Sequence, residues 1–334
     1  MDAPAMGFGI IGCGSIAAGS FAPSLLRSRV ARLAAVCRRD LEQARQFAAR
    51  FDGCPAYATA EELLHDGSVQ AVIVSTPTDT HAEYTCLAAS HGKHVLVEKP
   101  MGRSAAECRR MIQACSEAGV TLGVAYRRRL FPQVVRAQEI IAAGGIGGLV
   151  CVRTHYSGLM EAAPGNWRVE PGIGGAMMEM AVHRLEVLLN FGGRPAAVSA
   201  LVETVRHDWP VDDSDAILVR FTDGLIGMHS TILTSPPRRD QAIVDGTLGR
   251  IIIDPLEFHT DRLVLETPQG TEEIRVTPLE SPYFDLPMLE DFVCAARQGS
   301  QPVCDGITGY WVQATVDAAF RAARERRTVD VEPW

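Results

Sequence analysis

The chain has 334 residues, of which 47% are apolar and 22% charged, and its formal net charge is −8 at pH 7. These values are typical of a globular protein with two domains, and a negative charge without long basic runs argues against a nucleic acid or an anionic membrane as partner. No apolar run approaches the roughly 20 residues of a membrane span and no secretion signal begins the chain, so we expect a cytoplasmic protein with nine reduced cysteines and no metal site.

The first third of the chain alternates short apolar runs with longer amphipathic stretches. The runs predict buried strands and the stretches predict helices. The predicted strands are Phe8–Ile11, Leu33–Cys37, Ala71–Ser75, His94–Glu98 and Thr121–Val124, and the predicted helices include Asp40–Phe51, His81–Ser90 and Ser104–Ala118. This alternation indicates a parallel sheet covered by helices on both faces, which we place at residues 1–125.

The pattern changes after about residue 125. A helix predicted at Pro132–Ala143 is followed by segments in which apolar and polar residues alternate, as in Val198–Val205, Ala216–Phe221 and Leu225–Thr231. Alternation of this kind predicts an antiparallel sheet with one exposed face. We therefore expect a second domain at residues 126–334, closed by helices near Leu286–Arg297 and Thr308–Arg324.

The glycine-rich stretch at residues 7–17 fits the phosphate-binding pattern G-x-G-x-x-G/A in two registers. The pattern binds a dinucleotide only where its first glycine follows a strand and its last residue lies in the next helix. Too few residues precede the first register for a core strand, whereas Phe8–Ile11 precedes Gly12, so we select Gly12, Gly14 and Ala17. Gly12 would make the turn, Gly14 would let backbone N–H groups approach a pyrophosphate, and Ala17 would allow close helix packing. The alternative is a glycine-rich turn without a ligand.

The strand predicted at Leu33–Cys37 runs into Arg38, Arg39 and Asp40, at the place where such folds contact the adenosine ribose. Two guanidiniums offer a bidentate grip on a 2′-phosphate and a flat face for adenine. We therefore expect NADP(H) as the preferred cofactor, with NAD(H) as the alternative. The competing interpretation is that both arginines lie on a solvated turn, and in either case we expect Asp40 to cap the next helix.

Two further clusters carry chemistry. One predicted strand ends in Glu98-Lys99-Pro100, which places a carboxylate and an ammonium at the carboxyl edge of the sheet, where ligands of such folds bind. Glu179 and His183 are four residues apart and share one helix face, so the carboxylate can orient the imidazole for proton transfer. The alternatives are a surface ion pair and an ordinary buried histidine. The glycines at positions 172, 174 and 175 weaken the second alternative, because they permit close approach of the backbone to a ligand.

Together these motifs give the chain a resemblance to the Gfo/Idh/MocA oxidoreductase family, which includes glucose-fructose oxidoreductase and inositol dehydrogenase, over nearly its whole length. Within that family the likeness is to NADPH-dependent reductases of keto sugars. The matching segments are Gly12–Ala17, Ser75-Thr76-Pro77 with His81, Glu98-Lys99-Pro100, Tyr126 to Pro132, Asn166-Trp167-Arg168 and the glycine-led helix that ends in His183.

The resemblance implies a doubly wound Rossmann domain and an α/β domain with a large, mainly antiparallel open sheet, which such proteins often use to form homodimers or homotetramers. It implies hydride transfer between NADP(H) and a secondary alcohol or ketone of a sugar, cyclitol or related polyol. Lys99 would bind the reacting oxygen, His183 would be the general acid/base beside Glu179, and Arg128 would contact the substrate. The implied cofactor-binding residues are Gly12, Gly14, Ser15, Ile16, Ala17, Arg38, Arg39, Ser75, Thr76, Pro77, His81, Glu98, Lys99, Trp167 and Arg168.

The chain departs from the family pattern at several positions. It has Ile173-Gly174-Gly175 where three glycines are usual, Glu179 where Asp is usual, and Arg127 where Asn or His is common. A longer carboxylate moves its oxygens by roughly one bond length, enough to change how a substrate is held. Two other functions stay open: a non-catalytic nucleotide sensor, against which Lys99 and His183 count, and an NAD-dependent glycosidase, against which the arginine pair at 38–39 counts.

Overall fold

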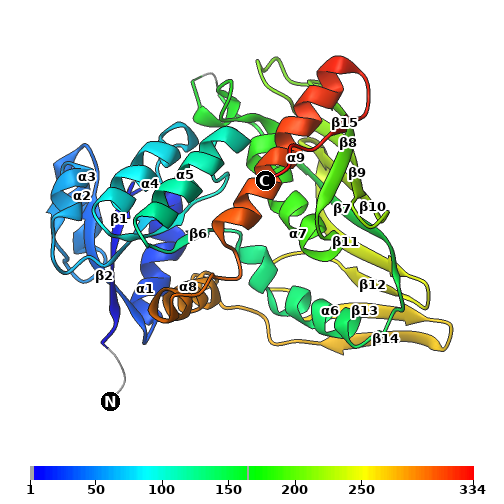
Figure 1. Cartoon of the computed structure of the whole chain (residues 1–334), viewed down its shortest axis with the longest axis horizontal. Coiled ribbons are helices and arrows are strands. Elements are labelled where there is room, and N and C mark those ends of the chain that lie inside the picture. The colour runs from blue at the N-terminus through cyan, green and yellow to red at the C-terminus, as the bar shows by residue number, and fades with distance from the viewer. Residues whose placement is uncertain (1–3, 164) are drawn as a thin grey trace. The chain divides into compact units, whose positions relative to one another are not determined.

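The computed structural model describes residues 4–163 and 165–334, and the chain forms two compact units (Figure 1). The first unit runs to Arg127 and also includes Glu280–Gly309, and the second contains Arg128–Leu279 and Tyr310–Trp334. The chain first passes from the first unit to the second after Arg127, two residues from the boundary expected at residue 125. The structure differs from the expected division in the segment Glu280–Gly309, which belongs to the first unit although we placed it in the second domain.

A parallel sheet forms the centre of the first unit. Its described strands are β1 (Met6–Ile11), β2 (Ala31–Cys37), β3 (Ala56–Tyr57), β4 (Ala71–Val74), β5 (His94–Val97) and β6 (Leu122–Val124), in the order β3-β2-β1-β4-β5-β6. From β1 the chain adds β2 and β3 on one side, and it then returns to add β4, β5 and β6 on the other side. The order of strands therefore reverses between β1 and β4. Ligands of doubly wound sheets bind at the carboxyl ends of the strands at such a reversal. The expected doubly wound Rossmann sheet is therefore confirmed.

Polar side chains cap the first turns of α2, α3 and α5 in the first unit. Asp40 accepts a hydrogen bond from the backbone N of Gln43 (3.1 Å), as predicted, and Ser104 accepts one from the backbone N of Glu107 (3.3 Å). Such caps satisfy N–H groups that a helix leaves without partners. The helical segments of this unit are η1 (Ala17–Phe21), α1 (Ala22–Arg27), α2 (Leu41–Ala49), α3 (Ala60–Leu64), η2 (Thr78–Thr80), α4 (His81–Ser90), α5 (Ala105–Glu117) and α8 (Leu286–Gln298). A further segment, η3 (Arg127–Leu130), begins at Arg127 and continues into the second unit.

Helix α8 explains why the late segment belongs to the first unit. The ring of Phe292 lies 5.9 Å from the ring of Phe8 in β1, and both side chains are buried. A Cβ atom at Gly123 in β6 would lie 2.8 Å from the Phe292 ring, so glycine makes room for it. Because β1 and β6 both contribute to this packing, α8 completes the core of the parallel sheet.

A mixed sheet forms the second unit. Its described strands are β7 (Leu149–Leu159), β8 (Pro195–Glu203), β9 (Ser214–Phe221), β10 (Ile226–Ile232), β11 (Thr234–Gly246), β12 (Arg250–Ile253), β13 (Arg262–Thr267), β14 (Gly270–Arg275) and β15 (Val329–Asp330). They follow the order β14-β13-β12-β11-β7-β10-β9-β8-β15. Strands β7 and β10 pair in parallel and their other neighbours are antiparallel, which confirms the expected, mainly antiparallel sheet.

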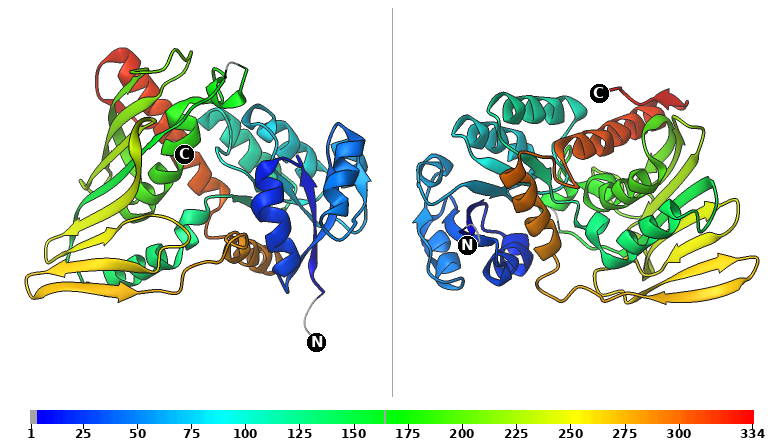
Figure 2. Two further views of the ribbon diagram at one scale, coloured as in Figure 1. Left: turned by 180° about the vertical axis from the view of Figure 1, so that it is seen from behind. Right: turned by 60° about the horizontal axis from the view of Figure 1, so that its bottom comes forward.

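Helices cover one face of this sheet (Figure 1, Figure 2). Along β9, Ile217 and Val219 are buried against them, whereas Leu218 on the opposite face is 51% exposed. The alternation read from the sequence therefore marks a covered face and an open face. The helical segments of the second unit are α6 (Pro132–Ala142), η4 (Trp167–Val169), η5 (Met177–Ala181), α7 (Val182–Gly192) and α9 (Gly306–Glu325). Helix α9 begins in the first unit and belongs to the second unit from Tyr310 onward.

None of the helices in the described part of the chain is long and apolar enough to cross a lipid bilayer.

Candidate active site

The glycine turn after β1 has the geometry of a dinucleotide-binding loop. Gly7 and Gly9 lie inside β1, so the first register cannot form the turn, and Gly12 follows the strand. Gly12 has φ +99°, and a Cβ atom there would lie 2.7 Å from the Ser75 carbonyl, so a larger residue is excluded. The Ser75 hydroxyl donates a hydrogen bond to the Gly12 carbonyl (2.7 Å) and ties this turn to the end of β4.

The start of the following helix fits a pyrophosphate. No described atom lies within 4 Å of the position that a Cβ atom of Gly14 would take, so the loop is open on that side. Ser15 and Ile16 form the first helical turn, and Ala17 is fully buried where the helix packs on the sheet. Backbone N–H groups at a helix start attract phosphate, and the residues present here suit a dinucleotide.

The basic pair after β2 lies beside this loop. Arg38 Nη1 donates a hydrogen bond to the carbonyl oxygen of Cys13 (2.9 Å), which stands between the two fingerprint glycines. Arg39 is exposed, and Asp40 turns away to cap α2. One guanidinium thus contacts the glycine turn itself, and a second lies next to it in the chain, where the adenosine ribose of such folds binds.

The loops after β4 and β5 are joined through a buried histidine. The ring nitrogens of His81 lie 2.9 Å from the carbonyl oxygens of Thr76 and Pro100. Burial lowers the pKa of this imidazole, although the two carbonyl oxygens favour its protonated form. Thr76 also accepts a hydrogen bond from the Thr80 hydroxyl (2.7 Å). His81 therefore fixes the predicted cleft-lining segment at residues 75–77 against the turn that carries Lys99.

Glu98 and Lys99 follow β5 as predicted. Glu98 is buried, with 6% of its surface exposed, and its Oε2 accepts a hydrogen bond from the backbone N of Lys99 (2.7 Å). The carboxylate thus holds the backbone from which the lysine side chain extends. At the carboxyl edge of a doubly wound sheet, an ammonium so placed suits an oxygen that becomes negative during a reaction.

The second unit carries the other predicted chemical group. Glu179 lies in the π-helical turn η5 and His183 in α7, which continues it. The Glu179 Oε2 accepts a hydrogen bond from Arg168 Nε (3.3 Å), and the Arg168 guanidinium lies 5.0 Å from the Trp167 ring centre. We expected Glu179 to act on His183, and the structure adds Arg168 as a partner for its carboxylate. Sequence reasoning missed this ion pair because it joins two motifs that were considered separately.

Two of the glycines that precede Glu179 lie against the protein's own chain. A Cβ atom at Gly175, whose φ is +94°, would lie 2.4 Å from Asp212 Oδ1, and one at Gly174 would lie 2.2 Å from the Arg168 carbonyl. Asp212 also accepts a hydrogen bond from the backbone N of Met177 (2.7 Å). Burial raises the pKa of Asp212 to about 6. The close approaches at Gly174 and Gly175 anchor the start of the helix that carries Glu179.

Arg128, predicted to contact the substrate, lies in a buried ionic cluster of the second unit with Asp240. Arg184, the residue after His183, forms a two-point ion pair with Asp240, and Arg128 Nη2 lies 3.5 Å from Asp240 Oδ2. Burial opposes ionisation of Asp240, but Arg184 and Arg128 hold its pKa below the ordinary value. In this arrangement the charge of Arg128 is balanced by a buried carboxylate.

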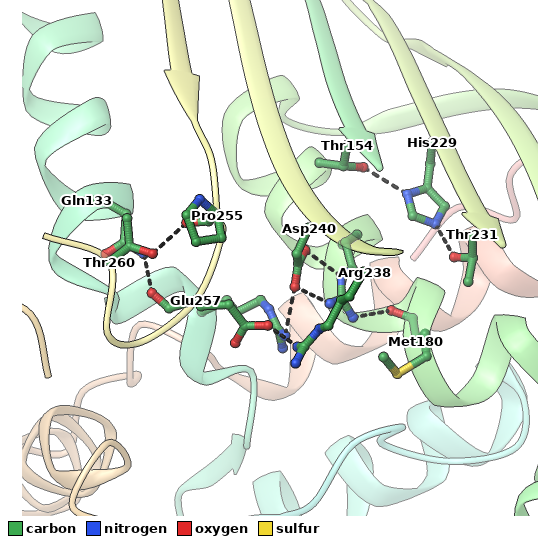
Figure 3. Close-up of polar contacts among 12 residues, drawn as sticks. Gln133, Thr154, Met180, His229, Thr231, Arg238, Asp240, Pro255, Glu257 and Thr260 are labelled. Atoms are coloured by element: carbon green, nitrogen blue, oxygen red, sulfur yellow. Dashed lines mark hydrogen bonds and ion pairs between the residues drawn. The ribbon is translucent and has the colours of Figure 1, made fainter. Parts of the chain in front are cut away.

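The same cluster holds the helix that carries His183. Arg184 Nη1 donates a hydrogen bond to the Met180 carbonyl (3.1 Å), and its guanidinium lies 4.2 Å from the Tyr156 ring centre. Arg238 pairs with Glu257 beside it (Figure 3). Arginine suits such a position because its planar fork bonds a carboxylate and stacks on an aromatic ring at once.

A neutral histidine lies deeper in the sheet (Figure 3). His229 is within hydrogen-bond distance of the hydroxyls of Thr154 (2.9 Å) and Thr231 (2.8 Å), and burial lowers its pKa to about 3. Asp215 Oδ1 lies 3.6 Å from the ring and accepts a hydrogen bond from the backbone N of Thr231. Burial, with a contribution from Asp212, raises the pKa of Asp215 to about 8.

A glycine turn after β1, a basic pair after β2 and a Glu-Lys-Pro turn after β5 define a dinucleotide-dependent oxidoreductase built on a Rossmann sheet. Residues 6–126 match the model of an oxidoreductase family with an NAD-binding Rossmann fold, and residues 134–252 match the GFO/IDH/MocA C-terminal domain. The chain belongs to the GFO/IDH/MocA oxidoreductase family, which confirms the resemblance seen in its motifs.

The similarity to known proteins extends over both units of the chain. A D-xylose 1-dehydrogenase (NADP(+)) 2 of Haloferax volcanii is 29% identical over 98% of this chain and 100% of its own. A trans-1,2-dihydrobenzene-1,2-diol dehydrogenase of Mus musculus is 31% identical over 78% of each chain. Among solved structures, an aldose-aldose oxidoreductase from Caulobacter crescentus, complexed with glycerol, has a TM-score of 0.90 at 26% identity and covers 98% of this chain and 99% of that one.

Proposed function

We propose that this protein is an NADP(H)-dependent oxidoreductase that transfers a hydride between nicotinamide and a secondary alcohol or ketone of a sugar, cyclitol or related polyol. The observation that carries the proposal is the turn after β5, where a buried carboxylate holds the backbone of Lys99 at the carboxyl edge of a Rossmann sheet. Relatives named for sugar and diol dehydrogenation support the substrate class.

The preference for NADP(H) rests on Arg38 and Arg39. Arg38 already contacts the loop that would cradle the pyrophosphate, and Arg39 is exposed beside it. A 2′-phosphate is a dianion near neutral pH, and a guanidinium binds it with charge-assisted hydrogen bonds that an unsubstituted ribose cannot match. The name of the Haloferax volcanii relative includes NADP(+), which agrees with this preference.

The chemistry assigns each side chain a task. The nicotinamide, when bound, donates or accepts the hydride. Lys99 stabilises the negative charge that grows on the substrate oxygen during reduction of a ketone, and His183 delivers the proton that oxygen takes up. In the oxidation of an alcohol, His183 receives that proton instead. Glu179 is held by Arg168 and precedes His183 by four residues. Its carboxylate either binds a substrate hydroxyl or orients the imidazole of His183.

The composition of the chain supports a specific role for Lys99. Of the 32 basic residues, 30 are arginines, and the lysines are Lys93 and Lys99. An ammonium is a compact charge that can give up a proton, which a guanidinium does not do in proteins. A chain that otherwise uses arginine therefore places one of its two lysines at the sheet edge where the reaction is expected.

Lysine substitution tests the proposal. Lys99→Ala should lower turnover on a sugar or polyol substrate about 100-fold or more while cofactor affinity, measured by fluorescence titration, changes little. Lys93→Ala is the matched control, because Lys93 Nζ bonds the Val69 carbonyl (2.7 Å) and should not affect turnover. Near-normal turnover in Lys99→Ala would remove Lys99 from the mechanism. Cofactor binding without turnover on a broad panel of keto sugars and polyols would favour a nucleotide sensor.

We further propose that the protein forms a homodimer through the open face of the second-unit sheet. Leu201, Leu218 and Met228 are 68%, 51% and 41% exposed on the adjacent strands β8, β9 and β10, and Leu218 pairs directly with Met228. These residues border a hollow of about 830 Å³ whose lining includes Arg326 and Arg327 but no residue assigned to catalysis. An exposed apolar sheet face suits a second copy of the same face.

Light scattering on the wild type and on Leu218→Lys tests the dimer. We expect a dimer that the Leu218→Lys substitution converts to a monomer at micromolar concentration, and a monomeric wild type would contradict the proposal.

The cysteines indicate the compartment that we propose for the protein. The buried thiols of Cys13, Cys37, Cys108, Cys115 and Cys304 suit a reducing compartment, so we place the protein in the cytoplasm.

A further inference from the structure

Arg127 lies at the end of the first unit's core and is surrounded by carboxylates and aromatic rings. Its side chain is 9% exposed, Nη2 donates to Glu98 Oε1 (2.9 Å), and Nη1 lies 3.1 Å from Asp285 Oδ1. The guanidinium centre lies 5.1 Å from the Phe284 ring centre and 5.8 Å from that of Phe21. A guanidinium can be held at such a site because its fork pairs with carboxylates while its faces stack on rings.

Glu98 connects this guanidinium to Lys99. One oxygen of the Glu98 carboxylate accepts from Arg127, and the other accepts from the backbone N of Lys99 (2.7 Å). Both bonds are needed to fix the carboxylate, because a single bond leaves it free to rotate about the side-chain torsions. The position of the Lys99 backbone is therefore coupled to the position of Arg127.

Asp285 connects the same guanidinium to the dinucleotide loop. Asp285 precedes α8 and is fully buried, and it accepts a hydrogen bond from the hydroxyl of Ser20 in η1, the helical turn that follows the glycine fingerprint. Arg127 Nη1 also lies 3.3 Å from this hydroxyl. Burial raises the pKa of Asp285, and Arg127 acts in the opposite direction.

The charges in this cluster make Arg127 decisive for Lys99. Two carboxylates, those of Glu98 and Asp285, face one guanidinium in a buried site. His81 is a further titratable group at this turn, and its ring nitrogens lie 2.9 Å from the carbonyls of Thr76 and Pro100. Without Arg127, the Glu98 carboxylate loses its guanidinium partner, and the ammonium of Lys99, one residue along, becomes a competing cation for it.

We propose that Arg127 is a positioning residue for Lys99: it holds the Glu98 carboxylate on the Lys99 backbone and balances its charge, so that the Lys99 ammonium is directed to the reacting oxygen. This inference rests on the proposed function for its catalytic consequence. Its structural part, the control of Lys99 through Glu98, can be measured without any turnover. Arg127 thereby links the turn that carries Lys99 to Ser20 beside the dinucleotide loop.

Amine labelling gives that measurement. Because the chain has two lysines, trinitrobenzenesulfonate labelling followed by peptide mass spectrometry reports Lys99 and, in the same sample, Lys93 as an internal reference. In Arg127→Gln we expect the pH at which Lys99 becomes half-reactive to rise by about one unit, a tenfold slower reaction at a fixed lower pH. The Lys93 curve should not move, and neither curve should move in Arg45→Gln, which removes an exposed guanidinium.

Asp285→Asn provides an opposite test and covers the case in which Arg127→Gln fails to fold. Removing one of the two carboxylates leaves Arg127 to Glu98 alone, so the Lys99 curve should shift to lower pH. Arg127→Lys should return the curve most of the way to the wild type. A Lys99 curve that stays in place in a folded Arg127→Gln or Asp285→Asn variant overturns the inference.

The kinetic consequence separates this inference from the proposed function. If both hold, Arg127→Gln lowers kcat about tenfold with little change in cofactor affinity, and its pH–rate profile shifts with the labelling curve. If the labelling curve shifts but Lys99→Ala keeps full turnover, Arg127 controls Lys99 and the catalytic role of Lys99 fails. If Lys99→Ala is inactive but the labelling curve does not move, the proposed function stands and the role of Arg127 fails.

Discussion

Replacing Asp215 with Asn should make the protein more stable, and the gain should grow with pH. Asp215 is buried next to His229, which is neutral because burial lowers its pKa to about 3, so no positive charge balances the carboxylate. Burial raises the pKa of Asp215 to about 8, whereas an unfolded carboxyl titrates near pH ~3.9. The folded state therefore favours the protonated acid. Its contribution to stability is complete below pH ~3.9 and is lost as the pH rises toward 8.

The size of the effect follows from that interval. Each pH unit between the two pKa values costs about 1.4 kcal/mol, so the three units from pH 4 to pH 7 cost on the order of 4 kcal/mol. Asn keeps an oxygen that accepts from the backbone N of Thr231 (3.1 Å) and does not titrate. The other titrating groups are common to both proteins and cancel in the difference.

Urea unfolding of the wild type and Asp215→Asn at pH 5, 6, 7 and 8 measures this difference. We expect the free energies of unfolding to diverge by about 1.4 kcal/mol per pH unit and to run parallel above pH 8. Asp208→Asn, on an exposed loop, is the control for loss of one charge and should show no such divergence. Parallel curves for wild type and Asp215→Asn across the whole range would refute the reasoning.

Three other substitutions test the site. Arg38→Ala should weaken NADPH binding about tenfold more than NADH binding, and equal losses by fluorescence titration would exclude a 2′-phosphate contact. Asp240→Asn should lower the free energy of unfolding by about 3–5 kcal/mol in urea, since two buried guanidiniums lose their counter-ion, and a loss below 1 kcal/mol would contradict this. Glu179→Gln should shift the pH–rate limb assigned to His183 if Glu179 orients the imidazole; a higher KM with an unchanged limb would instead indicate a substrate contact.

Local patterns in the sequence predicted the parallel sheet well. The predicted helix His81–Ser90 has the bounds of α4, and the glycine register follows from the single strand that precedes Gly12. The strands β11 to β14 were not predicted. β11 contains Pro236 and Pro237 and is exposed along its first half, so neither propensity nor alternation marks it as a strand.

The contacts of the candidate site are harder to read from a sequence because they join distant residues. Nothing local to Arg127 indicates that it pairs with both Glu98 and Asp285, or that Glu179 pairs with Arg168. Arg128 stays a predicted substrate contact, and its partner Asp240 on β11 could not be read from the local sequence. Motif spacing identifies which groups are present, whereas their partners depend on how strands and loops meet in three dimensions.

The interleaved course of the chain has a consequence for biosynthesis. The parallel sheet lacks the Phe292 side chain that packs against Phe8 until α8 has left the ribosome, and the second unit lacks Tyr310–Trp334 until that segment has been made. The nascent chain therefore carries two unfinished cores through most of its synthesis, and a gene fragment that stops at residue 127 should yield an insoluble product. Both cores become complete only once Glu280–Gly309 and Tyr310–Trp334 have been synthesised, which makes this a protein that chaperones should meet on the ribosome.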